Sequence, residues 1–355
     1  MRCFSINSTT YTVLNEIGRG GFAVVYRVHD AGGNPFAVKA IALGNLKAKA
    51  AALQELSLLS QLRGQSHVVQ LRGHAITKDQ VLLLMDLCEG PSALTRATQG
   101  MTDYEIRLLA RDVSGALRNM HELGYIHFDV KLENVLWQAD MWVLVDFGSC
   151  LQTSFDFGAM EVKEAAALRE RLREISTPSY RPPELVNQLR LDAVLGPPSD
   201  MWMLGVMLLT AVLRRPPFDG NDTAILAGPS RFSQIVVSEF STELWRLISS
   251  LLQREPLDRP TARAVLDSLS SAETWIAFPE TTQAESGGLL HTPNTEVSPD
   301  LLGEDTLPGP SPPLVPNPSL DSLETLDPFR FDVQRPSVTT PPCPVKNFDD
   351  LNPFA

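Results

Sequence analysis

The stretch that decides the fold reads HFDVKLENVLWQADMWVLVDFG and occupies residues 127–148. It contains two short apolar runs, which predict strands at 135–137 and 142–145. Polar residues stand directly before and after these runs. The oxygens of Asn134 and Asp146 are of the kind that Mg²⁺ prefers. The carboxylate of Asp129 is suited to accept a proton, and Lys131 is suited to offset developing negative charge. Each acidic residue alone would be read as a turn or cap residue, but their order indicates one site.

A second group of residues stands near the N-terminus. A glycine-containing turn between two β-rich runs would let backbone N–H groups approach phosphates. Its residues are Ile17, Gly18, Gly20, Gly21 and Val25. Fourteen residues after Val25, Lys39 alternates out of an apolar strand and is predicted to point inward. A buried cation needs a partner, and Glu55 on the following helix supplies one. Each feature also has a simpler interpretation. The glycines could form a plain turn, Lys39 could lie on the surface of a half-exposed strand, and Glu55 could lie on a solvated helix face.

The order of elements predicts an α+β protein with two lobes. Five β-rich runs surround one helix in the first part, at 11–17, 24–28, 36–41, 68–71 and 81–87, with the helix at 48–62. Helical patterns dominate afterwards, at 103–123, 199–213, 242–252 and 261–269. The longest apolar stretch, 201–213, is too short to span a bilayer.

Charge and composition divide the chain again near residue 278. The whole chain of 355 residues has a formal charge of −12, which argues against a nucleic-acid partner. Residues 280–355 contain 12 acidic and 3 basic residues, a net of −9. This Pro- and Ser-rich tail shows no apolar period and is predicted to be disordered. The four cysteines, Cys3, Cys88, Cys150 and Cys343, lie far apart and are predicted to be free thiols in a reducing compartment. The N-terminus resembles no signal peptide; acylation of Cys3 is left open.

The two groups together resemble the signature set of protein kinases. The resemblance covers about residues 11–270 and implies a two-lobed kinase fold that uses ATP with Mg²⁺, or with Mn²⁺ as the alternative. It divides the chain into an extension at 1–10, a kinase domain at 11–277 (lobes 11–87 and 88–277) and the tail at 278–355. It implies a catalytic role for Asp129, Lys131, Lys39, Glu55 and Thr177, and metal binding for Asn134 and Asp146. Ala37, Met85, Asp86 and Cys88 are expected to join Lys39 and the glycine turn in binding ATP.

Further expectations follow from the same resemblance. Glu184 is expected to pair with Arg259, both buried, and Asp200 to support the loop around Asp129. Within kinases, the Gly-Gly-Phe-Ala turn, LMDLC at 84–88, KLEN at 131–134 and DFGS at 146–149 are similar to the Numb-associated kinase family. That family, which includes adaptor-associated, cyclin-G-associated and actin-regulating kinases, has an extra helix in its activation segment. Residues 161–175 show a helical period.

One residue departs from the family pattern. Phe128 stands where an arginine that receives an activation-loop phosphate is usual. We therefore expect activity that does not depend on phosphorylation of residues 149–176. The groups that transfer the phosphoryl group are unaffected.

The tail contains two short motifs, Asp327-Pro328-Phe329 and Asn352-Pro353-Phe354. The first resembles peptides bound by adaptor appendage domains, and the second resembles peptides bound by EH-type domains. With the family resemblance they imply a cytoplasmic Ser/Thr kinase that is recruited to clathrin coats or to the periphery of the plasma membrane. Its expected substrates are clathrin-adaptor, endocytic or actin-regulatory proteins. A pseudokinase scaffold whose tail recruits adaptors is the alternative, and either tripeptide could be accidental.

Overall fold

A computed structural model describes residues 2–21, 23–152, 154–187 and 193–271, and the predicted disordered tail lies outside them. The chain divides into a compact unit, Met1–Pro279, and a second unit, Glu280–Ala355. The described strands are β1 Cys3–Ile6, β2 Thr9–Arg19, β3 Ala23–His29, β4 Pro35–Ala42, β5 Leu71–Ile76, β6 Gln80–Asp86, β7 Val135–Gln138, β8 Met141–Leu144, β9 Phe155–Asp156 and β10 Val194–Leu195. The described α-helices are α1 Leu46–Gln61, α2 Ala93–Gln99, α3 Asp103–Glu122, α4 Val162–Ile175, α5 Pro183–Val186, α6 Pro197–Leu213, α7 Asp222–Ala227, α8 Ser233–Glu239, α9 Thr242–Leu251 and α10 Ala262–Ser271.

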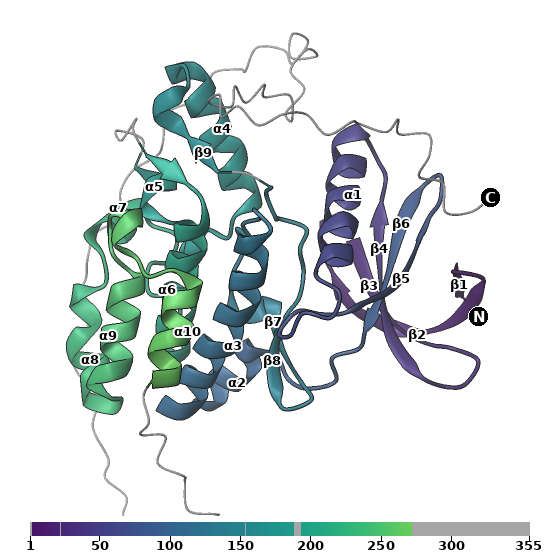
Figure 1. Ribbon diagram of the computed structural model, residues 1–355, viewed down its shortest axis with the longest axis horizontal. Helices are drawn as coiled ribbons and strands as arrows, with labels where there is room; N and C mark the ends of the chain where they lie inside the picture. Colours follow the sequence, from purple (N-terminus) through teal and green to yellow (C-terminus); the bar gives the residue numbers. More distant parts are fainter. Residues whose placement is uncertain (1, 22, 153, 188–192, 272–355) are drawn as a thin grey trace, which may run out of the picture. The chain divides into compact units, whose positions relative to one another are not determined.

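The first lobe is an antiparallel sheet with α1 packed on one face (Figure 1). Its six strands follow the order β1-β2-β3-β4-β6-β5. Alternation along β4 divides its side chains between the two faces. Ala37, Lys39 and Ile41 line the cleft described below, whereas Val38 and Ala40 join a separate apolar cluster. The inward direction expected for Lys39 is therefore confirmed.

Strand β1 extends this sheet at its N-terminal edge, and the sequence patterns had not indicated it. Phe4 pairs with Tyr11 across the β1–β2 ladder. Phe4 and Ile6 are buried in the second apolar cluster, together with Tyr11, Tyr26, Val28, Val38, Ala40, Leu82 and Leu84. The β1–β2 turn lies against β5, because a Cβ on Gly73 would come within 2.8 Å of Asn7 Nδ2. Residues before Tyr11 thus cover one face of the sheet.

Helix α1 begins at the cap Asn45, whose side chain accepts from the N–H of Ala48. Leu56, Leu59 and Leu62 are buried as the period of three suggested. Leu53 is the exception, since 36% of it is exposed. The helix repeats every 3.6 residues, so a run of leucines at threes rotates gradually off the packed face.

The second lobe is mainly helical (Figure 1). Helix α3 carries a capping box between Thr102 and Glu105. Helix α6 is buried along nearly its whole length. At Gly205 a Cβ would lie 2.8 Å from Leu251, so the glycine allows α6 and α9 to pack closely.

The remaining expectations are confirmed in part. The helix expected at 161–175 is present as α4. The strand expected at 68–71 is wrong: β5 begins at Leu71, and Val68 makes only an isolated bridge to Leu144. The apolar run marks burial there rather than strand pairing. Cys3, Cys88 and Cys150 are free thiols, whereas Cys343 lies outside the described residues. Among the described helices, none has the length and apolar character needed to cross a membrane.

Candidate functional site

A cleft of about 670 Å³ is lined by the glycine turn, β4, α1, the end of β6 and residues around β7 and β8. Its volume is in the range of sites for nucleotide-sized ligands. All the residues predicted to bind ATP line it, namely Ile17, Gly18, Gly20, Gly21, Val25, Ala37, Lys39, Met85, Asp86 and Cys88. The fold thus gathers residues that are distant in sequence around one cavity.

The glycine turn joins β2 to β3, and Gly20 N–H donates to Ala23 O at 2.8 Å. A Cβ on Gly20 would meet nothing closer than 3.8 Å, and on Gly21 nothing within 4 Å. Packing within the described protein therefore does not require glycine at these positions. The open space over the turn fits a ligand whose phosphates approach the backbone closely.

Lys39 lies at the back of this cleft. Its Nζ is 2.6 Å from Glu55 Oε1 and 2.6 Å from Asp146 Oδ1. Burial alone would lower the pKa of Lys39, but the charges of Glu55 and Asp146 raise it above its usual value. Burial opposes ionisation of Asp146 as well, yet the charge and hydrogen bond of Lys39 lower its pKa to about 2. Lys39 and Asp146 are therefore both charged at neutral pH.

Asp129, Lys131 and Thr177 form a second cluster. Lys131 Nζ donates to Asp129 Oδ2 at 2.6 Å and to Thr177 Oγ1 at 3.0 Å. Thr177 Oγ1 in turn donates to Asp129 Oδ1 at 2.6 Å. The contact expected between Thr177 and these two residues is confirmed. A carboxylate held in this way can orient a hydroxyl group and accept its proton.

Asn134 is bonded to the second cluster through Asp129. Its Nδ2 donates to Asp129 O at 2.9 Å and to Asp129 Oδ2 at 3.2 Å, and the amide oxygen takes no part in these two bonds. Asn134 and Asp146 both line the cleft. An amide oxygen and an ionised carboxylate suit a divalent cation that also binds nucleotide phosphates. In the described parts of the chain, no group of three or more His, Cys, Asp or Glu side chains is placed to hold a metal.

Asp200 at the start of α6 fixes the loop around Asp129. Its carboxylate accepts from the N–H groups of His127 and Phe128, each at 2.8 Å, and lies 2.8 Å from His121 Nε2. Phe128 adopts a φ of 65°, a conformation that is rare for a bulky residue. The two hydrogen bonds hold this strained turn, as expected of Asp200.

The Phe128 side chain is fully buried in the main core. It therefore occupies apolar space at a position where the resembling family usually has an arginine. The buried pair expected further along is also present: Arg259 Nη2 lies 2.7 Å from Glu184 Oε2, and Ser199 Oγ donates to Glu184 Oε1.

Helix α4 is tied to its surroundings by contacts that the sequence patterns did not reveal. Arg173 Nη2 lies 2.7 Å from Asp222 Oδ2 on α7. Arg181 Nη2 donates to Arg173 O at 2.7 Å, and Ser149 Oγ donates to Ile175 O at 3.3 Å. The C-terminal end of α4 is thus bonded on both sides, to the segment that carries Thr177 and to the one that follows Asp146.

At the end of β6 the surroundings of Asp86 and Cys88 were not predicted from the sequence. The carboxylate of Asp86 accepts two hydrogen bonds from Arg72, at 2.5 and 2.7 Å, so it is already occupied. Burial, with a contribution from Asp86, raises the pKa of Cys88 to about 11, so this residue is a neutral thiol. Leu136 and Val145 also line the cleft, and they were not among the site residues predicted from the sequence. Their positions in the sequence, close to Asn134 and Asp146, could have indicated that they belong to the site.

Comparison with known proteins supports the assignment of the domain. A model of the protein kinase domain matches residues 11–269. A probable serine/threonine-protein kinase of Dictyostelium discoideum is 27% identical over 75% of this chain and 34% of its own length. The serine/threonine-protein kinase ppk30 of Schizosaccharomyces pombe is 26% identical over 99% of this chain and 38% of its own length. Calcium-dependent protein kinase 25 of Oryza sativa subsp. japonica is 31% identical over 73% of this chain and 48% of its own length.

The chain thus spans between about a third and a half of the length of these relatives. The cleft, the Lys39–Glu55 pair and the Asp129 cluster all lie inside the matched region. The chain therefore belongs to the protein kinase family, and its residues 11–269 form a protein kinase domain.

Proposed function

We propose that the protein transfers the γ-phosphoryl group of ATP to serine or threonine hydroxyls of protein substrates. The observation that carries this proposal is the placement of Lys39 Nζ, 2.6 Å from both Glu55 and Asp146. This ion pair is a condition for activity in protein kinases. The chain therefore has the charged groups of an active enzyme in an assembled arrangement.

The roles of the remaining residues follow from their contacts. Lys39 in the cleft would bind nucleotide phosphates, and Asn134 and Asp146 would hold Mg²⁺, or Mn²⁺ in its place, which neutralises phosphate charge when bound. Asp129 would orient the substrate hydroxyl and accept its proton, while Lys131, 2.6 Å away, offsets charge on the transferred group.

A pseudokinase scaffold is the competing function. The two are separated by transfer of ³²P from ATP to a Ser/Thr peptide mixture, measured for wild type and Asp129→Asn. We expect transfer by wild type and a loss of at least about a hundredfold in the variant, as for a general base. ATP binding, followed by thermal shift, should be similar in both. If both proteins bound ATP and neither transferred ³²P to the peptides, the scaffold function would be favoured.

The finer assignment is membership of the Numb-associated kinase family and action on clathrin-adaptor or other endocytic and actin-regulatory proteins. Its support is the sequence of the glycine turn, residues 84–88 and DFGS, together with helix α4 in the activation segment. The two tail motifs fit the same assignment, although Asp327–Phe329 and Asn352–Phe354 lie outside the described residues.

Recruitment through the tail is tested in cells. Each motif presents one Phe beside a Pro, so single motifs would bind weakly and gain by acting together. Changing Phe329 and Phe354 to Ala should abolish enrichment of the cytoplasmic protein at clathrin coats. Phe348→Ala, a tail phenylalanine outside both motifs, is the matched control. Unchanged enrichment of the double variant would remove adaptor and EH-type domains as partners.

A further inference from the structure

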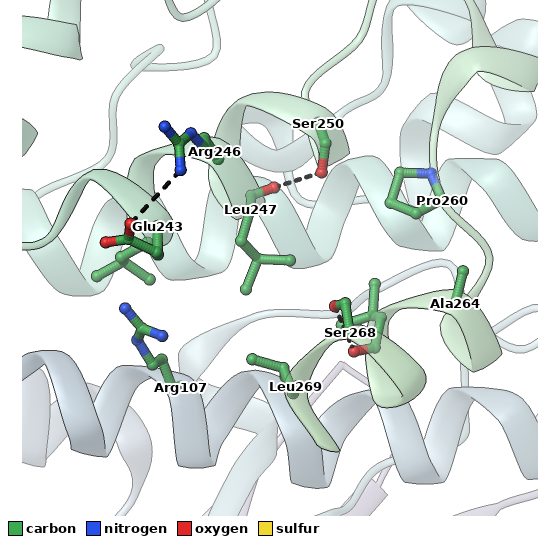
Figure 2. Close-up of a pocket in the computed structure, with 11 residues that line it drawn as sticks. Arg107, Glu243, Arg246, Leu247, Ser250, Pro260, Ala264, Ser268 and Leu269 are labelled. Carbon is green, nitrogen blue, oxygen red and sulfur yellow. Dashed lines mark hydrogen bonds and ion pairs between the residues drawn. The ribbon is translucent and has the colours of Figure 1, made fainter. Parts of the chain in front are cut away.

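Figure 2 shows a groove between α3, α9 and α10. It shares no lining residue with the catalytic cleft. Its cavity measures about 360 Å³. Apolar side chains make up most of its lining, from Leu244 and Leu247 on α9 to Pro260, Ala264, Val265 and Leu269. A cavity of about 150 Å³ already accepts benzene, so this one has room for a larger aromatic side chain.

The rim of this groove is polar and partly basic. Arg107 on α3 is held in place by Asp103 Oδ1 at 2.5 Å and by Ser241 Oγ at 2.6 Å. Among the residues that the structure describes, the Arg246 side chain makes one polar contact, a long one of 3.4 Å with Glu243, and both side chains are exposed. Such a surface pair contributes little, so Arg246 is able to contact a new partner. The groove therefore suits an aromatic residue accompanied by a carboxylate.

The chain itself supplies such a segment directly after α10. Helix α10 forms one wall of the groove, and its last residue, Ser271, follows Leu269 by two positions. The next eight residues read AETWIAFP, with Trp275 as the only tryptophan after α9 and Glu273 two positions before it. Four residues can span about 13 Å, so Trp275 is within reach of the cavity.

We propose that residues 272–279 dock into the groove between α3, α9 and α10, with Trp275 in the cavity and Glu273 facing Arg107 and Arg246. Tethering favours this occupant over a second copy, since a linked segment acts at an effective concentration in the millimolar range. Trp275 would stack on an arginine side chain at the rim and pack on Leu247. Docking would extend the folded domain beyond α10 and fix the point where the acidic tail begins.

The contact is tested by a double-mutant cycle in the full chain, with Trp275→Ala, Leu247→Ala and the double variant. We expect Trp275→Ala to lower Tm by about 5 °C. Leu247→Ala should lower Tm clearly in the wild-type background and by less than half as much when Trp275 is already absent, because touching residues are not additive. Leu14→Ala, on the exposed side of β2 in the other lobe, should add fully to Trp275→Ala. Full additivity for Leu247 as well would overturn the proposal.

Iodide quenching of tryptophan fluorescence gives a second measurement that does not depend on unfolding. The difference between wild type and Trp275→Phe isolates the emission of Trp275. We expect this component to resist iodide at all protein concentrations. A fully quenched Trp275 would overturn the proposal and leave the groove for another partner. Protection that appears only as the protein concentration rises, with a doubled mass in sedimentation, would overturn it in favour of a second copy.

Discussion

Lys39 Nζ and Glu55 Oε1 lie 2.6 Å apart, and both side chains are buried. The pair connects β4 to α1, so it fixes the helix relative to the sheet as well as the charge in the cleft. Asp146 contacts the same Nζ, and the cation therefore joins three segments that are far apart in the sequence.

Replacing Glu55 by Gln keeps the volume but removes the charge that positions Lys39. We expect the rate of phosphoryl transfer at saturating ATP to fall at least about tenfold, which corresponds to about 1.4 kcal/mol of transition-state free energy. Glu122→Gln, which removes an exposed carboxylate 3.9 Å from Arg118, is the control and should leave the rate unchanged. If Glu55→Gln transferred phosphate as fast as Glu122→Gln, the role given to Glu55 would be contradicted.

Thr177 is predicted to act through its hydroxyl, which donates to Asp129 and accepts from Lys131. Thr177→Ala should lower kcat about tenfold, since Asp129 and Lys131 lose their common partner. Thr177→Ser retains the hydroxyl and should keep most of the activity. If the serine variant were as slow as the alanine variant, the methyl group rather than the hydroxyl would be important.

Activity is predicted not to require phosphorylation of residues 149–176. Phe128 is buried in the core, and α4 is held by the Arg173–Asp222 pair and by Arg181 without any phosphate. Phosphatase-treated protein should therefore transfer phosphate at the same initial rate as untreated protein. A lag that is removed by incubation with Mg-ATP would contradict this prediction.

Stability is predicted to decrease as the pH falls below about 6.5. Burial lowers the pKa of His127 below its ordinary value of 6.5, so the unfolded chain binds a proton that the folded chain refuses. Stability from this residue is complete above 6.5 and is lost toward its lower folded pKa, by at most about 1.4 kcal/mol per pH unit. Asp146, with a pKa of about 2, remains ionised in this range and does not contribute.

Urea unfolding at pH 7.5 and 5.5 measures this dependence. His127→Gln removes the titrating ring and should reduce the difference in unfolding free energy between the two pH values. An undiminished difference in the variant would place the responsible group elsewhere.

The sequence predicted the motif-bearing elements because their chemistry requires fixed residue types at fixed spacing. Lys39, Asp129 and Asn134 lie where these motifs placed them. It did not predict β1, since four residues beginning at Cys3 carry too weak an alternating pattern to be recognised before their pairing with β2 is known. Nor did it predict the contacts of Arg173 and Arg181, because long side chains find partners that depend on tertiary packing. Apolar patterns alone also misplaced Leu53, which is partly exposed, and the run at 68–71, which is mostly not part of a strand.

The most direct measurement of the central claim is the transfer of ³²P from ATP by wild-type protein, followed by identification of the phosphorylated amino acid. An assembled Lys39–Glu55–Asp146 arrangement predicts labelled phosphoserine or phosphothreonine, with at least about a hundredfold less label from Asp129→Asn. Protein that binds Mg-ATP but labels no hydroxyl above the level of Asp129→Asn would contradict it.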